Sequence, residues 1–291
     1  MKMLKEIHTK AYAKINFNLN VLPVRSDGFH NIESIFQTIN LYDELSIKIN
    51  EKKGCEVYCE EIKLPLKNTL TNAYQAFCEC VNIFVPGVYV ELKKGIPNGG
   101  GLGGGSSDAA ALIRVLETVC GITLSIEQLD YIASKTGSDV FFFMHCDKDG
   151  KGCALVSGLG EIIKKINPRH DLYLVLIFPD ESSSTKEAYS LVDKVIFEGK
   201  TIKCPKFCEL EQIYNSEIQN WTFKNIFTPV ISDKLISVRN AITELKKSGC
   251  CYAEMSGSGS TVFGVFSLEQ QAEYVSNLLA ASWKQKLVRT V

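Results

Sequence analysis

The sequence contains no apolar run close to the roughly 18–20 residues that are needed to cross a bilayer. Its apolar segments at 140–144 and 172–178 are much shorter than that. The first residues, Met1–Ile7, also contain no uninterrupted apolar stretch of the kind that forms a signal peptide. We therefore expect a cytoplasmic protein without a membrane partner.

An excess of charge of one sign is also absent. The 32 Lys and Arg residues balance 33 Asp and Glu residues, which gives a formal net charge of −1. A general nucleic-acid-binding protein needs a basic face for phosphates, so this balance argues against that class. With 45% hydrophobic and 22% charged residues the composition is globular. At about 150 residues per domain, the length predicts two domains.

The sequence has no Cys-x-x-Cys pair, although it contains 11 cysteines. A chain of this length can build a hydrophobic core without disulfides. We therefore interpret the scattered thiols as reduced, small apolar residues. A metal-binding or disulfide role stays open as the alternative.

Predicted helices and strands follow one another without a regular βαβ order, which favours an α+β fold over a doubly wound sheet. Gly and Pro residues around 155–170 suggest a domain boundary there. The predicted strands are 12–21, 41–49, 88–92, 172–178, 251–255 and 261–266, and the predicted helices are 68–81, 109–120, 125–134, 233–247 and 268–281.

The most unusual segment is the run 99–105, in which six of seven residues are glycine. Glycine adopts positive φ without strain and lets the backbone approach a ligand closely. The helix predicted after the run offers free N–H groups and a partial positive charge at its start. Together these features predict a polyphosphate site. Ser106 and Ser107 add hydroxyl groups that can bind phosphate or Mg²⁺.

Other uses of such a glycine run fit less well. A flexible linker would be polar on both sides, whereas this run lies between a predicted strand and an apolar helix. The P-loop motif requires a lysine that is missing before Ser106. Gly99, Gly101 and Gly104 match the dinucleotide-binding pattern G-x-G-x-x-G, which is weak by itself and usually opens a domain. The protein-kinase triplets His-Arg-Asp and Asp-Phe-Gly do not occur.

The segment from Pro97 to Ser107 resembles the phosphate-binding motif of the GHMP kinases, a family of small-molecule kinases. Residues 11–19 resemble the N-terminal motif of that family, and residues 255–263 resemble its C-terminal glycine loop. The resemblance implies a two-domain α+β fold. Its N-terminal domain, at 1–160, would be like domain 2 of ribosomal protein S5, and its C-terminal domain, at 161–291, would be ferredoxin-like. It also implies ATP and Mg²⁺ as cofactors.

Finer detail is similar to one branch of this family. Residues 14–16, 25–30, 36–37 and 136–143 resemble the branch that phosphorylates the 2-hydroxyl of a cytidine-diphosphate-linked methylerythritol, in the non-mevalonate route to isoprenoids. A homoserine- or mevalonate-type kinase and a catalytically silent binding protein of the same fold are the alternatives. The segment 27–30 favours the first branch, because homoserine and mevalonate have no pyrimidine to stack on an aromatic ring. No pattern predicts the oligomeric state.

Two charged residues fit the chemistry of phosphoryl transfer. Asp139 lies at the edge of an apolar run, where partial burial would favour its use as the base that accepts the hydroxyl proton. A helix N-cap is the alternative for Asp139. Lys14 lies in an otherwise apolar strand and needs an anionic partner, so it can orient Asp139 or assist deprotonation. A lysine that protects an exposed sheet edge is the alternative for Lys14.

The resemblance implies the remaining site residues. Phe29 and Tyr189 would stack on the two faces of the cytosine, and His30 would read its edge. A loop histidine bound to backbone is the alternative for His30. The expected cofactor-binding residues are Pro97, Asn98, Gly99, Gly100, Gly101, Leu102, Gly103, Gly104, Gly105, Ser106, Ser107, Asn68 and Lys94, of which the last two would lie near adenine. The expected substrate-binding residues are Asn16, Phe29, His30, Thr185, Tyr189, Gly257, Ser258 and Gly259, and the expected metal ligand is Ser107.

The sequence departs from the family pattern at residues 225–228. An Asn-Asp-hydrophobic-Glu segment is common there, and Ile226 and Thr228 replace both acids in this chain. The departure removes candidate metal ligands, so Ser107 and the nucleotide itself are the expected ligands of Mg²⁺.

Overall fold

The structure is a computed structural model that describes residues 6–50, 53–199 and 202–291. The chain forms two compact units, each built from three separate segments. Unit 1 comprises Met1–Ala13, Leu41–Asn98 and Gly103–Gly152, and unit 2 comprises Lys14–Asn40, Gly99–Leu102 and Cys153–Val291. The sequence predicted a single boundary near 160. The long strands β1 (Glu6–Val24) and β2 (His30–Asn50) instead each contribute residues to both units.

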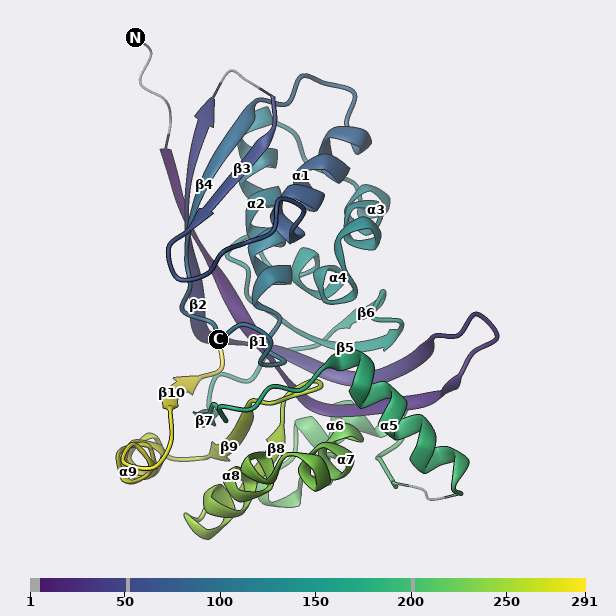
Figure 1. Cartoon of the computed structure of the whole chain (residues 1–291), viewed down its shortest axis with the longest axis vertical. Coiled ribbons are helices and arrows are strands. Elements are labelled where there is room, and N and C mark those ends of the chain that lie inside the picture. The colour runs from purple at the N-terminus through teal and green to yellow at the C-terminus, as the bar shows by residue number, and fades with distance from the viewer. Residues whose placement is uncertain (1–5, 51–52, 200–201) are drawn as a thin grey trace. The chain divides into compact units, whose positions relative to one another are not determined.

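Unit 1 consists of a sheet with helices on one side (Figure 1). Strand β4 (Gly87–Lys93) pairs parallel with β3 (Cys55–Cys59) and antiparallel with β2, which also pairs with β1. Buried side chains such as Val90 of the sheet and Leu112 of the helices form the core of this unit. The helices are α1 (Thr69–Cys80), α2 (Gly104–Cys120), α3 (Ile126–Thr136) and α4 (Ser138–Met144).

Local sequence sets the ends of these helices. The side chains of Asn68 and Ser125 each accept a hydrogen bond from the third helical amide, and each forms a capping box. Helix α2 ends at Gly121, which adopts the left-handed conformation with φ +66°. The helices predicted at 68–81, 109–120 and 125–134 are thus confirmed, with α2 beginning earlier, at Gly104.

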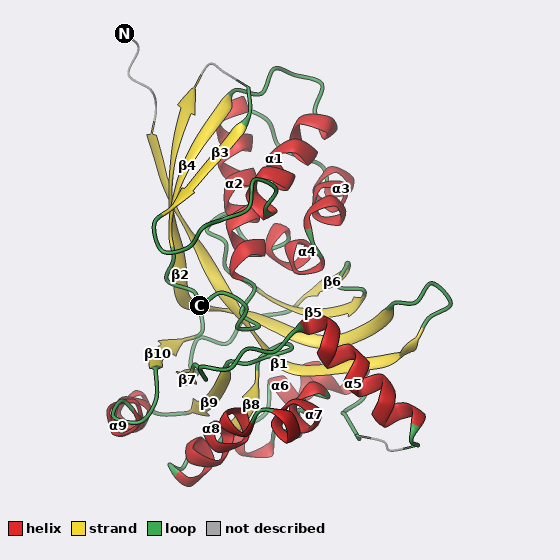
Figure 2. Ribbon diagram, in the orientation of Figure 1, coloured by secondary structure: helices red, strands yellow, loops and turns green. Residues whose placement is uncertain are grey.

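Unit 2 contains a second sheet besides its part of the first. Its share of the first sheet comprises the unit 2 residues of β1 and β2 together with β5 (Cys153–Gly158) and β6 (Ile162–Lys165). Strand β5 pairs antiparallel with both β2 and β6. The second sheet is antiparallel in the order β10 (Gln285–Arg289), β7 (Tyr173–Ile177), β9 (Val262–Phe266), β8 (Tyr252–Met255). The helices of this unit are α5 (Thr185–Phe197), α6 (Leu210–Tyr214), α7 (Phe227–Lys234), α8 (Ile236–Lys247) and α9 (Glu269–Leu279), with 3₁₀ turns at Phe207–Glu209 and Ile218–Asn220 (Figure 2).

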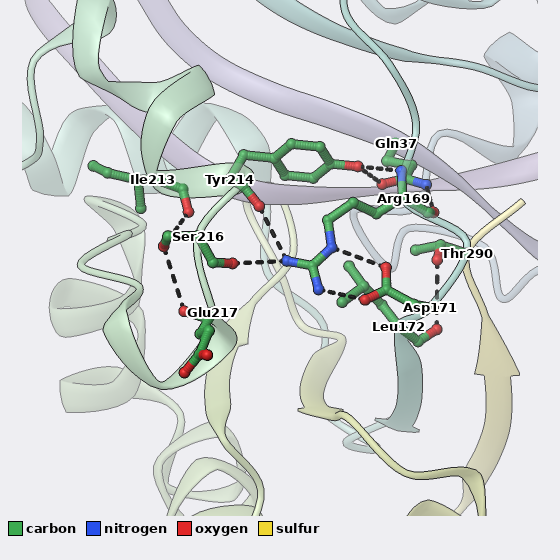
Figure 3. Close-up of polar contacts among 9 residues, drawn as sticks. All are labelled: Gln37, Arg169, Asp171, Leu172, Ile213, Tyr214, Ser216, Glu217 and Thr290. Atoms are coloured by element: carbon green, nitrogen blue, oxygen red, sulfur yellow. Dashed lines mark hydrogen bonds and ion pairs between the residues drawn. The ribbon is translucent and has the colours of Figure 1, made fainter.

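Arg169 joins several segments of unit 2 through one network of polar contacts (Figure 3). Its guanidinium donates to the carbonyl oxygens of Tyr214 at 3.1 Å and Ser216 at 2.9 Å, and it pairs with Asp171. The Tyr214 hydroxyl accepts from the Arg169 amide at 2.8 Å and donates to the side chain of Gln37 on β2. The network therefore fixes α6 against β2 and against the loop before β7.

Within the described residues, no helix is both long and apolar enough to cross a membrane. None of the eleven cysteines, all of which lie in the described ranges, forms a disulfide. Burial raises the pKa of the Cys55 and Cys250 thiols to about 12, so both stay protonated at neutral pH and are poor nucleophiles. The described part of the chain brings together no group of His, Cys, Asp or Glu residues suited to a metal ion.

Candidate active site

The first half of the glycine run packs against the C-terminal glycine loop inside unit 2. Gly101 has φ +75°, and a Cβ atom on it would lie 2.1 Å from the carbonyl oxygen of Ser256. The Ser256 hydroxyl donates to the carbonyl oxygen of Gly101 at 3.0 Å. A Cβ atom on Gly257 would lie 3.1 Å from that same carbonyl oxygen. The two backbones thus approach each other more closely than side chains would allow.

Strand β1 brings the N-terminal motif to the same place in unit 2. The Lys14 amide donates to the carbonyl oxygen of Leu102 at 2.9 Å, and the Asn16 amide donates to the Ser256 hydroxyl at 3.4 Å. Lys14 is only 3% exposed, and its ammonium group donates to the side-chain oxygen of Asn16. The same ammonium group lies 4.4 Å from the centre of the Phe36 ring. This burial contradicts the alternative of an exposed lysine at a sheet edge.

The segment that departs from the family pattern supports the C-terminal glycine loop. The buried side-chain amide of Asn225 donates to the carbonyl oxygens of Met255 and Gly257, both at 2.7 Å. The Thr228 hydroxyl donates to the carboxylate of Glu254, a buried residue of β8. Burial raises the pKa of Glu254, although the hydrogen bond from Thr228 opposes this. The carboxyl group of Glu254 therefore lies beside Thr228, although residues 225–228 themselves contain no acidic residue. No pattern in the sequence singled out Glu254.

The second half of the glycine run opens helix α2 in unit 1. Gly103 precedes the helix with φ +72° and supplies no side-chain cap. The Ser107 amide donates to the carbonyl oxygen of Gly103 at 2.9 Å, which is the first helical hydrogen bond. The amides of Gly104, Gly105 and Ser106 come before it and have no partner within the helix. Together with the helix dipole, these amides favour an anion at this end.

A buried cluster of one lysine and two carboxylates lies beneath the start of α2. The Lys94 ammonium donates to Asp43 and, at 3.2 Å, to Asp108. The second oxygen of Asp43 accepts from the amides of Gly95 at 2.7 Å and Ile96 at 2.8 Å. A Cβ atom on Gly104 would lie 3.3 Å from the Lys94 nitrogen. The cluster thus anchors the chain on both sides of the glycine run to strand β2.

The cluster contains two carboxyl groups and one lysine, so ion pairing alone does not balance its charge. The side chain of Asp43 is fully buried and that of Asp108 is 3% exposed. One carboxyl oxygen of Asp108 has no hydrogen-bond partner among the described residues. Burial raises the pKa of Asp108 well above its ordinary value, and the charge of Asp43 raises it further, while Lys94 opposes both. Asp108 therefore keeps its proton to a higher pH than an ordinary aspartic acid.

Two of the residues expected near adenine have structural partners in unit 1. The Lys94 side chain is 12% exposed and its ammonium group lies in the buried cluster. Asn68 caps α1 and donates to the carbonyl oxygen of Pro65 at 2.9 Å. Contact of either residue with adenine stays a prediction.

Asp139 lies in the first turn of α4 and is half-buried, between an exposed Ser138 and a buried Val140. The N-cap of this helix is Gly137, and no side chain makes a capping hydrogen bond. The alternative of Asp139 as a helix cap is therefore wrong. The partial burial that the sequence predicted for this carboxylate is confirmed.

Comparison with known proteins shows where this combination of motifs occurs. Residues 68–147 match the model for the N-terminal domain of GHMP kinases, and residues 217–285 match the model for the C-terminal one. A 4-diphosphocytidyl-2-C-methyl-D-erythritol kinase from Treponema pallidum is 36% identical over 287 residues, which cover 96% of this chain and 97% of that protein. The chain belongs to the family of 4-diphosphocytidyl-2-C-methyl-D-erythritol kinases, within the GHMP kinases.

Further comparisons agree with membership of this kinase family. The Clostridium tetani protein of the same name is 37% identical over 269 residues, which cover 91% of this chain and 92% of that protein. The crystal structure of a 4-(cytidine 5'-diphospho)-2C-methyl-D-erythritol kinase matches with a TM-score of 0.78 and 26% identity, over 98% of this chain and 99% of that one. The predicted GHMP kinase fold and the class of ATP-dependent small-molecule kinase are thereby confirmed.

Two of the residues expected to bind cytosine in this kinase family lie together in unit 2. The Tyr189 ring stacks on the His30 ring, with centroids 5.3 Å apart and an interplanar angle of 29°. The two His30 ring nitrogens lie 2.8 Å from the Leu22 carbonyl oxygen and 3.3 Å from the Asp193 carboxylate. Both of these partners are acceptors, so both contacts are hydrogen bonds only when the imidazole carries two protons. Phe29, in contrast, is 60% exposed.

A further predicted residue connects α5 with the C-terminal glycine loop of this kinase. The hydroxyl groups of Thr185, at the start of α5, and of Ser258 are 2.8 Å apart. Gly259 in the same loop has φ +90°, and a Cβ atom on it would lie 2.6 Å from the sulfur of Met255. This loop therefore has little freedom to accept a different sequence.

Proposed function

We propose that this chain transfers the terminal phosphoryl group of ATP to the 2-hydroxyl of 4-diphosphocytidyl-2-C-methyl-D-erythritol. The observation that carries the proposal is the glycine run itself. Gly99, Gly101 and Gly103 all have positive φ, and the run leads into a helix whose first amides have no intrahelical partner. Such a backbone suits a polyphosphate, and the family membership supplies the acceptor.

In this proposal, main-chain amides of residues 99–107 bind the phosphates of ATP, and the start of α2 lends its dipole to them. Phosphoryl transfer needs positioning and charge stabilisation more than covalent chemistry. We assign Asp139 as the base that accepts the proton of the acceptor hydroxyl. We assign Lys14 to stabilise the developing negative charge, because its ammonium group is buried and therefore acts through a low dielectric. Pro97 and Asn98 would lead the chain into this phosphate site.

We also propose Mg²⁺ as the cofactor, with Ser107 as its protein ligand. The donor set fits, because Mg²⁺ accepts a hydroxyl oxygen and commonly keeps several waters and phosphate oxygens. The nearby carboxylates of Asp43 and Asp108 both contact Lys94, so they do not compete for this role. When bound, Mg²⁺ would neutralise charge on the phosphates of ATP.

Recognition of the acceptor is assigned to unit 2. Tyr189 and Phe29 would stack on the cytosine and His30 would hydrogen-bond to its edge. Asn16, Thr185 and the loop 257–259 would bind the diphosphate and hydroxyl groups. The contact between the Tyr189 and His30 rings supports this assignment, because it places two of these residues side by side within unit 2. We place the reaction in the cytoplasm, and we retain 1–160 and 161–291 as the proposed family domains.

The experiment that tests the proposal is a phosphoryl-transfer assay with a panel of acceptors. The purified chain is incubated with ATP, Mg²⁺ and one of three acceptors: the diphosphocytidyl substrate, homoserine or mevalonate. ³¹P NMR of the products then shows which hydroxyl was esterified. We expect a new phosphomonoester only with the diphosphocytidyl substrate. Turnover of homoserine or mevalonate instead would assign the chain to another kinase of this fold, and no turnover of any acceptor would point to a silent binding protein.

A further inference from the structure

Unit 1 contains a cavity that none of the proposed catalytic steps uses. Its volume is about 420 Å³, and its lining comes from the start of β1, from β2, from α2 and from the loop after α4. Four cations line it: Lys10, Arg114, Lys148 and Lys151. Arg114 lies ten residues after Gly104 on α2, which is about 15 Å along the helix. The cavity is therefore separate from the helix start that we assign to ATP.

The cations of this cavity outnumber the acids that line it. Among the residues that the structure describes, none of the four has a carboxylate oxygen within ion-pair distance. The two acids in the lining are Glu44 and Asp149, and Glu44 lies 3.7 Å from Lys93, outside the set of four. Four cations and two acids leave the lining with a surplus of two positive charges, in a chain whose overall net charge is −1. A charge surplus confined to one cavity is typical of an anion site.

Arg114 is the most informative of these residues. Its guanidinium donates to the carbonyl oxygen of Phe143, and burial lowers the pKa of Arg114, although the charges of Asp147 and Glu117 oppose this. Desolvation of a cation is unfavourable unless an anion or several acceptors compensate for it. One carbonyl leaves several of the five N–H donors of a guanidinium available for a ligand.

Aromatic rings hold two of the ammonium groups in place. The Lys10 nitrogen lies 4.1 Å from the centre of the Tyr42 ring, and the Lys151 nitrogen lies 5.5 Å from the centre of the Tyr12 ring. The two rings contact each other edge to face, with centroids 5.6 Å apart. These cation–π contacts restrict the lysines without neutralising them. The cations are therefore positioned before any ligand arrives, which lowers the entropic cost of binding.

We propose that this cavity is a second anion site, which binds a phosphate-bearing small molecule through Arg114 and the lysines at 10, 148 and 151. Guanidinium binds phosphate in a bidentate manner, and several lysines beside it favour a ligand of more than one negative charge. The ligand is either free inorganic phosphate or diphosphate, or the phosphate group of a larger metabolite.

Calorimetry with inorganic pyrophosphate tests the proposal. The chain is first titrated with a non-hydrolysable ATP analogue, which reports on the glycine run alone. Pyrophosphate is then titrated into protein saturated with the analogue. We expect it still to bind, and we expect Arg114→Met and Lys151→Met each to weaken it at least tenfold. Lys48→Met, which removes an exposed lysine from the same sheet, is the matched control and should bind pyrophosphate normally.

The possible outcomes separate this site from the glycine run. If the analogue abolishes pyrophosphate binding, the anion occupies the ATP site and the second site does not exist. If Lys151→Met binds as tightly as the parent chain, the proposal is wrong even where Arg114→Met fails to fold, because Lys151 lies in the loop after α4, outside the helices and strands, and is only half-buried. Failure of the analogue to bind would count against the proposed function and would leave the pyrophosphate result to decide the second site. Orthophosphate and glycerol phosphate, titrated in parallel, distinguish a free phosphate from a phosphoester.

Discussion

A Cβ atom on Gly101 would lie 2.1 Å from the carbonyl oxygen of Ser256, which is closer than any real side chain can come. Gly99, two residues earlier, has a similar φ of +70° but no atom within 4 Å of its Cβ position. Glycine is therefore required at these two positions for different reasons. Gly99 needs only the backbone conformation, and Gly101 also needs the empty space.

Gly101→Ala should damage nucleotide use far more than Gly99→Ala. At Gly99 the substitution costs only backbone strain of about 1–2 kcal/mol, which is roughly a tenfold effect. At Gly101 the added methyl group must push the two glycine loops apart. We expect a loss in kcat/KM for ATP well beyond that factor, together with a lower Tm. Equal effects of the two substitutions would show that the contact with Ser256 does not matter.

Asp139→Asn should leave folding and ATP binding intact while lowering kcat by about 10²–10⁴-fold, because the amide cannot accept the hydroxyl proton. Steady-state kinetics and calorimetry with an ATP analogue measure the two effects separately. Asp130→Asn is the control, since it removes a carboxylate of unit 1 that pairs with His145 at 3.2 Å. Near-normal kcat for Asp139→Asn would remove Asp139 from the role of base.

Lys94→Met should destabilise the protein by about 3–5 kcal/mol, because it leaves the buried carboxylate of Asp43 without its cation and removes a hydrogen bond to Asp108. Lys48→Met is again the control. It removes a partly exposed pair with Glu91 and should cost at most about 1 kcal/mol. Urea unfolding of both variants measures the difference. Similar stability of the two variants would contradict a structural role of the cluster beneath α2.

The free energy of unfolding of the Asp108→Asn variant should increase, relative to that of the parent chain, as the pH rises. The pKa of Asp108 is raised in the folded state. Above about pH 4 the unfolded state therefore releases this proton while the folded state keeps it. The folded parent chain thus loses stability with rising pH through this group, and the asparagine variant does not. Urea unfolding at pH 5 and pH 8 should show the shift. The opposite trend would mean that Asp108 is ionised in the folded protein.

Phe29→Ala should raise KM for the diphosphocytidyl substrate by tenfold or more and leave KM for ATP unchanged, since stacking on a base is worth about 1–3 kcal/mol. Tyr58→Ala removes another exposed aromatic side chain, 54% exposed in β3, and serves as the control. Equal increases in both KM values for Phe29→Ala would place this ring outside the cytosine site.

The sequence predicted the elements with strong local signals. The capping residues Asn68 and Ser125 and the stop at Gly121 marked helices that the structure confirms. Strands at 12–21 and 41–49 were also correct, although β1 and β2 extend well beyond them. The family resemblance identified both glycine loops, and the contact of Gly101 with Ser256 shows that they pack against each other.

Other features depend on contacts that no local pattern reports. β3 and β6 are short, and β10 pairs with β7 more than a hundred residues away in sequence. Asp43 gave no signal as a buried carboxylate, because its partners come from residues 94–96 and 108. Glu254 is likewise placed beside Thr228 only by the folded chain. Lys94 was expected near adenine, whereas its buried ion pairs could not be foreseen from the sequence.

In the proposed function, main-chain amides of the glycine run bind the phosphates of ATP. Backbone amide NMR of the ¹⁵N-labelled chain, titrated with a non-hydrolysable ATP analogue and Mg²⁺, tests it most directly. We expect the amide resonances of Gly99–Ser107 to shift the most and to saturate together at one dissociation constant. Unchanged resonances for these nine residues, with saturating shifts elsewhere in the chain, would contradict it.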